Sequence, residues 1–147
     1  MTYAYDESYL SDVQKNLGFF FQFTLCTLQL SPKETQDAFL HSEIPAQIEQ
    51  GNPNFLCGKS GFELATIVFT GREIFSQILM AQQEPFYPQA EYWCGYVLAY
   101  CHWKNNISFD TLLHHFSLAQ LLDSYTLLHE ADISKAEQII MEHVPVY

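Results

Sequence analysis

The spacing of apolar positions predicts helices along nearly the whole chain, and the stretch 91–103 is the most apolar of them. Read as a helix, EYWCGYVLAYCHW places its aromatic residues on one stripe, and Gly95 and Ala99 form a second row where another helix backbone could approach. The polar positions that remain are Glu91, His102 and Lys104. Because apolar side chains would cover nearly every side, we expect this helix to be buried at the centre of the fold. Its predicted core residues are Tyr92, Trp93, Gly95, Tyr96, Ala99, Tyr100 and Trp103.

Serine residues placed just before apolar runs predict the starts of most other helices. Ser31 is followed by Pro32 and Glu34, which combines an N-cap, a first-turn proline and a capping box. Similar boxes are predicted to begin at Ser60, Ser117 and Ser134, and a simple cap at Ser108. The other expected helices cover 5–30, 31–40, 42–51, 61–79, 109–116, 118–125 and 134–143.

Three stretches depart from this regular pattern. Gly18 lies inside the first helix, where glycine costs about 1 kcal/mol relative to alanine, and it would suit a close crossing with another helix. Residues 64–70 are rich in β-branched and aromatic residues, so a short strand is the alternative there. Helix is favoured because no partner strand is visible elsewhere. The prolines within 84–88 predict a rigid, extended connection into the central helix.

These elements predict an all-α fold, a single helical domain over residues 1–147. The expected architecture is a compact bundle of about six to seven helices around the central buried aromatic helix. A chain of this length buries roughly 68–70% of the surface that its unfolded form exposes. It can therefore hold a core without metal ions or disulfides.

The charge balance bears on the kind of partner. Six basic residues stand against seventeen acidic ones, for a formal net charge of −11. Such a field repels nucleic acids and anionic membranes and favours basic partners. The pair of short helices within 107–125 has the size of a helix-turn-helix, but its second helix carries no Arg or Lys for phosphates. We therefore expect no direct nucleic-acid binding.

Location and cysteine usage indicate a reducing compartment. The longest apolar stretch is far shorter than the roughly 20 residues that a membrane-spanning helix needs. The N-terminal residues are acidic where a signal peptide is basic, so we expect a cytoplasmic protein. Without a close CxxC pair, the cysteines are interpreted as small buried apolar residues. They are Cys26, Cys57, Cys94 and Cys101.

The sequence lacks the spacings on which most catalytic and metal sites depend. Cys94, Cys101 and His102 share one helix, but they lack the tight paired spacing of zinc ligands, so no metal or cofactor is expected. There is no GxSxG motif, and residues 58–61 lack the frame of a phosphate-binding loop. We therefore expect a protein that is not an enzyme.

Two groups of residues are candidates for contact with a partner. His129, Glu130 and Asp132 bring three ionisable side chains together just ahead of the last helix, as an acid–base pair or a recognition patch. A simpler interpretation is that the acids satisfy the N-terminus of that helix. Aromatic side chains on the polar N-terminal segment could anchor an interface. These are Tyr3, Tyr5 and Tyr9.

Several of these segments together resemble a group of short, largely uncharacterised bacterial proteins. The group has an EYWxGxxLAYYQW-like centre and an LHEADISK-like tail, matched by residues 91–103 and by LHEADISK at 128–135. YAYDESYLSDVQKNLG and GNPNFLCGKSGFELA are also similar, so the resemblance covers most of the chain. Cys101 and His102 stand where the group has Tyr and Gln, which leaves any role of those two positions open. The resemblance implies a component of toxin–antitoxin-type operons near ADP-ribosyltransferase-like proteins, with no catalytic residues to transfer.

Three hypotheses for function follow. The first is a non-catalytic acidic interaction module, an antitoxin or regulatory subunit that binds and neutralises a partner protein. A toxin encoded in the same operon is one candidate for that partner. The second is an acidic inhibitor that mimics nucleic acid and occupies the groove of a defence or restriction enzyme, which requires carboxylates aligned on one face. The third is an enzyme that uses His129, Glu130 and Asp132, which requires a pocket into which at least two of them point.

Overall fold

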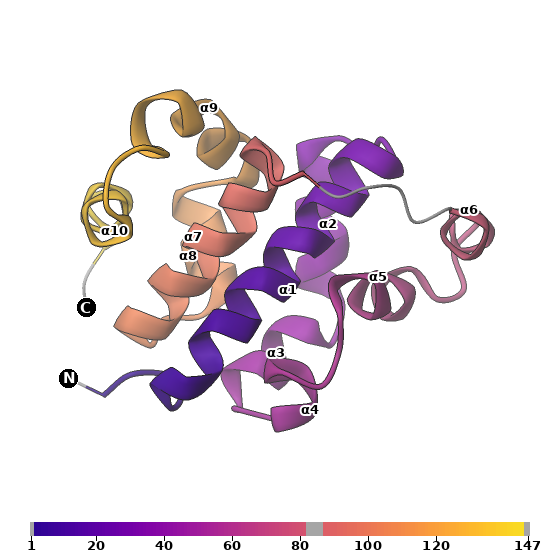
Figure 1. The fold of residues 1–147 in the computed structure, drawn as a ribbon, viewed down its shortest axis with the longest axis horizontal. Coiled ribbons are helices and arrows are strands. Elements are labelled where there is room, and N and C mark those ends of the chain that lie inside the picture. The colour runs from indigo at the N-terminus through magenta and orange to yellow at the C-terminus, as the bar shows by residue number, and fades with distance from the viewer. Residues whose placement is uncertain (1, 82–86, 146–147) are drawn as a thin grey trace.

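The computed structural model describes residues 2–81 and 87–145, and every regular element in these ranges is helical (Figure 1). Most of the connection predicted at 84–88 lies outside the described residues. None of the described helices combines the length and apolar character required to cross a bilayer. In chain order the elements are η1 (Glu7–Tyr9), α1 (Leu10–Gln22), η2 (Phe23–Thr27), α2 (Pro32–His41), α3 (Ile44–Glu49), α4 (Pro53–Leu56), α5 (Gly61–Phe69), α6 (Phe75–Met80), α7 (Ala90–Asn105), α8 (Phe109–His115), α9 (Leu118–Leu128) and α10 (Ile133–Met141).

The crossing of α1 and α7 forms the centre of the fold, and these two helices make the most extensive contact of any pair. Figure 1 shows them side by side, with α8, α9 and α10 on the α7 side and α2 to α6 on the α1 side. Glycine permits the close approach on both helices. A Cβ at Gly95 would lie 2.4 Å from the Leu17 carbonyl, and one at Gly18 would lie 2.9 Å from the Tyr92 carbonyl oxygen. The close crossing expected at Gly18 and Gly95 is therefore present.

The all-α prediction is confirmed, but α7 is not the wholly enclosed aromatic helix that was expected. Its aromatic stripe lies at the rim of the fold, with the rings of Tyr92, Tyr96 and Tyr100 only partly buried. The fully enclosed side of α7 instead carries small and aliphatic residues, together with His102, which had been assigned to a polar position. Large phenylalanine side chains of α1 and its neighbours fill the core; they include Phe20, Phe21, Phe39 and Phe109.

The expected number of helices was too low, because ten α-helices lie within the described residues. The predicted helix over 5–30 divides into a 3₁₀ turn, α1 and a π-helical segment, η2, and Gln29 with φ of 57° marks its end. The predicted helix over 61–79 stops at Phe69, since a turn at Thr70 and Gly71 separates α5 from α6. The strand alternative at 64–70 is not adopted.

Most of the predicted caps are present. Full capping boxes begin α2, α5 and α9, where Ser31, Ser60 and Ser117 each accept a hydrogen bond from the backbone N–H three residues on. The box predicted at Ser134 is wrong. Asp132 occupies the N-cap of α10, and the Glu137 carboxylate turns inward to accept hydrogen bonds from Lys104 and Asn105.

Candidate functional site

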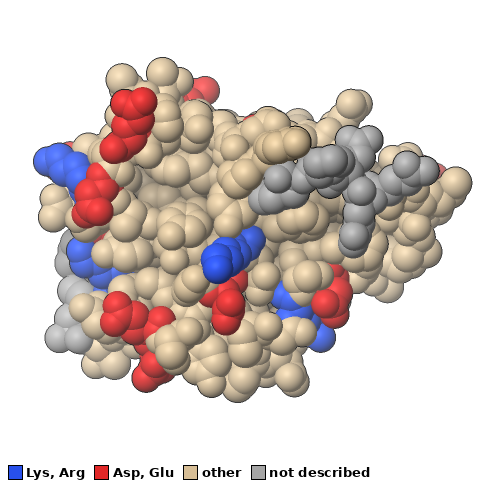
Figure 2. Space-filling model, viewed as in Figure 1, with Lys and Arg blue, Asp and Glu red and all other residues tan. Residues whose placement is uncertain are grey.

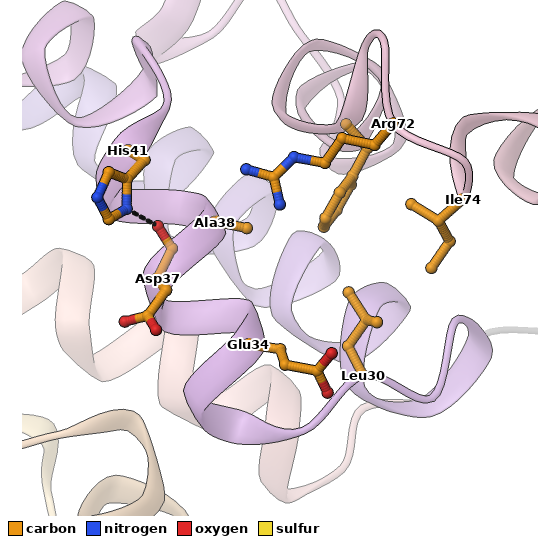
Figure 3. Close-up of a pocket in the computed structure, with 8 residues that line it drawn as sticks. Leu30, Glu34, Asp37, Ala38, His41, Arg72 and Ile74 are labelled. Atoms are coloured by element: carbon orange, nitrogen blue, oxygen red, sulfur yellow. Dashed lines mark hydrogen bonds between the residues drawn. The ribbon is translucent and has the colours of Figure 1, made fainter.

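A groove of about 360 Å³ lies between α2 and the turn that follows α5 (Figure 3). Polar and apolar side chains alternate around it. The lining residues are Leu30, Glu34, Asp37, Ala38, His41, Phe69, Arg72 and Ile74. Its volume is near the lower end of the roughly 300–1,000 Å³ that ligand pockets occupy, so it suits a single side chain or a small group.

The α2 wall of the groove follows from helical spacing, since Glu34, Ala38 and His41 fall at i, i+4 and i+7 on one face. Oε1 of Glu34 accepts a hydrogen bond from the Ser31 backbone N–H at 3.1 Å, as part of the capping box. Nδ1 of His41 lies 2.7 Å from the Asp37 carbonyl oxygen. Within the described part of the chain, neither the second oxygen of Glu34 nor Nε2 of His41 has a hydrogen-bond partner.

Asp37 contributes less to the groove than its position suggests. Its Oδ2 atom accepts a hydrogen bond from Nζ of Lys33 at 3.2 Å, which is an ion pair one helical turn apart. In Figure 3 its carboxylate points away from Arg72, whereas the Glu34 carboxylate extends across the groove. Glu34 is therefore the carboxylate best placed to meet a ligand.

The opposite wall is a type II turn. The Arg72 backbone N–H donates to the Phe69 carbonyl oxygen at 3.0 Å, Thr70 has φ −54° and ψ 129°, and Gly71 has φ 82°. The third position of such a turn requires a positive φ, which glycine adopts without strain. The turn folds Arg72 back so that its guanidinium lies 5.7 Å from the centroid of the Phe69 ring.

Arg72 makes no ion pair with any other described residue, although the chain has almost three acids for every base. By contrast, Lys33 pairs with Asp37 and Lys104 pairs with Glu137. Figure 3 shows the Arg72 guanidinium and the Glu34 carboxylate on opposite walls of the groove, with Leu30 and Ile74 toward one end. The guanidinium donors are therefore open to an anionic group of a ligand.

Two large apolar side chains are exposed on α6, the helix that follows the groove residue Ile74. Leu79 and Met80 are 63% and 81% exposed, and they follow Ile74 of the groove within the same short segment. Figure 1 places α6 at the end of the molecule opposite α10. Neighbouring large apolar side chains exposed beside charged ones are typical of protein-binding surfaces. We call the groove together with Leu79 and Met80 the α6 surface.

The cluster predicted ahead of the last helix lies on the exterior of the fold. His129, Glu130 and Asp132 are all exposed. The His129 ring stacks on Tyr125 at 4.2 Å, and its Nε2 atom is 3.8 Å from the Glu130 carboxylate. Asp132 accepts a hydrogen bond from the Ser134 hydroxyl and makes no side-chain bond to the helix N–H groups. The three side chains therefore do not match the predicted acid–base arrangement. They also do not match the simpler interpretation, in which the acids bond to the N-terminal N–H groups of α10.

The three predicted N-terminal tyrosines have different environments. Tyr3 stacks on Trp103 with ring centroids 4.2 Å apart and remains 49% exposed. Tyr5 turns inward near His102, and burial raises the pKa of its hydroxyl. Tyr9 is partly buried against the core. Only Tyr3 has the exposure expected of an interface anchor.

The N-terminal segment is held against the end of α7 by its backbone as well as its rings. The Ala4 N–H donates to the Trp103 carbonyl oxygen at 3.0 Å, and Nε1 of Trp103 donates to the Tyr5 carbonyl oxygen at 2.8 Å. Trp103 is consequently buried, whereas Trp93 is only partly buried and contacts Tyr125 by its edge. Of the other predicted core positions, Gly95 and Ala99 are buried.

Three of the four thiols, those of Cys26, Cys94 and Cys101, offer little nucleophilic character. Partial burial of the thiol and the nearby Glu91 carboxylate raise the pKa of Cys26 to about 11, although the residue as a whole is exposed. Burial also raises the pKa of Cys94 and of Cys101. Thiols with raised pKa values stay protonated near neutral pH and react slowly. Within residues 2–81 and 87–145, no group of three His, Cys, Asp or Glu side chains could hold a metal ion.

Sequence reasoning missed the α6 surface. The signal was present in Thr70-Gly71-Arg72, where a glycine precedes the only arginine of the chain, but the stretch was predicted to lie within one helix over 61–79. No family model, curated protein or solved structure matches this chain.

Proposed function

We propose that this protein is a non-catalytic interaction module that binds a partner protein through the α6 surface. An antitoxin or a regulatory subunit, which neutralises its partner by occupying it, would act in this way. The observation that carries the proposal is the exposure of Leu79 and Met80 on the helix that follows the groove, together with Arg72 in the groove lining, which makes no ion pair with any described residue. Apolar anchors next to charged groups supply affinity and orientation in protein interfaces.

The distribution of charge gives more support to this function than to a nucleic-acid mimic. On the face shown in Figure 2, the acidic side chains form small separate groups interspersed with basic ones and wide neutral areas. A mimic needs carboxylates in rows that follow the spacing of phosphates. An enzyme that uses His129, Glu130 and Asp132 has less support, because all three residues are exposed on the exterior.

The proposal is tested by isolating the protein from its native cells with bound partners, and by comparing variants matched for exposure. Leu79→Ser combined with Met80→Ser removes the two apolar anchors of α6. Leu127→Ser is the control, since Leu127 is 84% exposed on α9, away from α6. We expect one protein to be recovered with the parent chain and with the control, and to be reduced at least about tenfold with the α6 variant, a loss of about 1.4 kcal/mol or more.

Two results would contradict the proposal. One is recovery of the same partner in equal amount with all three proteins. The other is a loss that accompanies Leu127→Ser as strongly as the α6 variant, which would place the interface on α9. Circular dichroism of each variant shows that its helical content is unchanged, so that a loss of partner is a loss of binding.

A further inference from the structure

We propose that the groove of the α6 surface receives the C-terminal lysine of a partner protein. In this arrangement the terminal carboxylate binds Arg72, the ammonium group binds Glu34, and the aliphatic stem lies on the apolar lining between them. The inference rests on the proposed function, because the lysine belongs to the partner, and it specifies the chemistry by which that partner is recognised.

The anion-binding side of the groove is Arg72. Its guanidinium is the only basic group of the lining apart from the His41 imidazole, and it has no carboxylate partner among the described residues. The type II turn through Gly71 fixes the backbone from which it extends, and the Phe69 ring lies beneath it. A guanidinium offers parallel N–H donors that match both oxygens of a carboxylate.

The cation-binding side is Glu34. One of its carboxylate oxygens accepts a hydrogen bond from the Ser31 N–H, and the other has no hydrogen-bond partner among residues 2–81 and 87–145. That bond holds the side chain in place on the first turn of α2, and in Figure 3 its carboxylate extends toward Leu30 on the wall opposite Arg72. The net charge of −11 draws a basic ligand toward this wall, whereas an anion without a cationic group would be repelled.

The lining between the two charges is apolar. Leu30, Ala38 and Ile74 border the space, and the Phe69 ring lies next to the Arg72 guanidinium. Lysine covers apolar surface with its methylene stem while its ammonium stays at a polar edge. A C-terminal lysine carries a cation, an aliphatic stem and a carboxylate in this order. A C-terminal arginine does so too, but the lysine ammonium is the more compact cation and suits a groove of this small volume better.

The position of the carboxylate distinguishes a chain end from two other sources of lysine. An internal lysine has no anion of its own for Arg72. Free lysine carries an α-ammonium next to its carboxylate, which would bring a positive charge toward the Arg72 guanidinium. At a protein C-terminus that nitrogen is a neutral amide, so the terminal residue fits the groove best.

Small lysine derivatives test the inference without knowledge of the partner. The probes are Nα-acetyl-lysine, its methylamide, Nα,Nε-diacetyl-lysine and free lysine, each titrated into labelled protein and followed by NMR. The reporters are the methyl groups of Leu30, Ala38 and Ile74 and the Nε–H group of Arg72. We expect Nα-acetyl-lysine to bind in the millimolar range, and each of the other three probes at least about tenfold more weakly.

Two variants assign each charge to its wall. Arg72→Gln should remove the preference for the free carboxylate over the methylamide. Glu34→Gln should remove the preference for the free ammonium over its acetylated form, and it keeps the capping box because glutamine serves at that position. Lys33→Gln is the control, since Lys33 lies on α2 outside the groove lining, and it should preserve both preferences.

The inference is overturned if Nα-acetyl-lysine produces no saturable shift at the four reporters, or if the three charge-altered probes bind as well as it does. Tighter binding of free lysine would assign the groove to the amino acid and not to a chain end. If partner recovery depends on Leu79 and Met80 while the probes do not bind, the proposed function stands and this inference fails. Probe binding without any dependence of partner recovery on Leu79 and Met80 would contradict the proposed function instead.

Discussion

Leu17 and Gly95 bring the backbones of α1 and α7 into direct contact, since a Cβ on Gly95 would lie 2.4 Å from the Leu17 carbonyl carbon and oxygen. The obstacle is backbone, so no side-chain rotation can relieve it. The two helices can approach this closely only because neither Gly95 nor the neighbouring Gly18 carries a side chain. This crossing sets the distance between the two halves of the fold.

Gly95→Ala should therefore destabilise the protein, although alanine is the better helix former by about 1 kcal/mol. Separating α1 from α7 loosens the packing around both helices, and we expect a loss of about 3 kcal/mol in the free energy of unfolding. Urea denaturation followed by circular dichroism measures the change. Ala119→Gly, at an exposed position of α9, is the control for helix propensity and should cost about 1 kcal/mol. A stability equal to the parent would contradict the contact between Leu17 and Gly95.

The two central glycines illustrate what a single sequence can predict. A glycine in an otherwise apolar helix has little reason to be there except close packing, so Gly18 and Gly95 could be identified without coordinates. Serine caps likewise predicted the starts of α2, α5 and α9, because a cap depends on residues only three positions apart. Local chemistry is sufficient for features of this kind.

Features that depend on tertiary contact were not predictable in the same way. His102 looked polar, yet it is enclosed by Phe109 and the N-terminal segment, which the spacing within α7 cannot show. Glu137 looked like a capping residue, but Lys104 and Asn105 draw it inward. The groove forms where α2 meets the turn at Gly71, two segments some thirty residues apart, so no window of sequence contains it.

The Lys104–Glu137 pair links α10 to the end of α7 and gives a second prediction. The Glu137 side chain is 6% exposed and its carboxylate lies 3.3 Å from Nζ of Lys104. Lys104→Met leaves that carboxylate with Asn105 as its remaining partner, so we expect the free energy of unfolding to fall by about 1–3 kcal/mol. This is less than the cost of breaking a fully buried ion pair, because the lysine side chain is partly exposed. Thermal unfolding by calorimetry measures it.

The exposed pair between Lys33 and Asp37 provides the comparison. Both side chains are at least half exposed, and they lie one turn apart on α2. Lys33→Met should change the free energy of unfolding by no more than about 0.5 kcal/mol. Equal losses for the two methionine variants would mean that the burial of Glu137 adds nothing to the strength of its ion pair.

The Tyr5 hydroxyl is buried without a hydrogen-bond partner among the described residues, which leads to a stabilising substitution. A buried polar group without a partner carries the cost of its lost hydration. Tyr5→Phe removes that group and keeps the ring beside His102, so we expect a gain of about 1 kcal/mol. Urea denaturation detects it, and Tyr9→Phe should have little effect. A loss of stability in Tyr5→Phe would reveal a bound water or another partner for the hydroxyl.

The pH dependence of stability should reflect His102. Nδ1 lies 2.7 Å from the Ile107 carbonyl oxygen, so Nδ1 donates, and Nε2 is left as a buried acceptor with no partner among the residues that the structure describes. Burial lowers the pKa of His102, and the bond to Ile107 offsets this only in part. The folded pKa is therefore below the unfolded value of about 6.5. Below about pH 6.5 the unfolded chain binds more protons at this histidine than the folded protein does. The contribution of His102 to the free energy of unfolding is therefore complete above about pH 6.5, and it decreases as the pH falls toward the folded pKa.

Urea denaturation between about pH 7.5 and 5.5 tests this prediction. A difference of one bound proton between the two states changes the free energy of unfolding by at most about 1.4 kcal/mol per pH unit. His102→Asn keeps a donor near the Ile107 carbonyl and removes the titrating ring, so its stability should fall less than that of the parent over this range. His114→Asn, at an exposed position of α8, should keep the slope of the parent. Parallel curves for the parent and His102→Asn would show that the imidazole is protonated in the folded state without penalty, which requires an acceptor at Nε2.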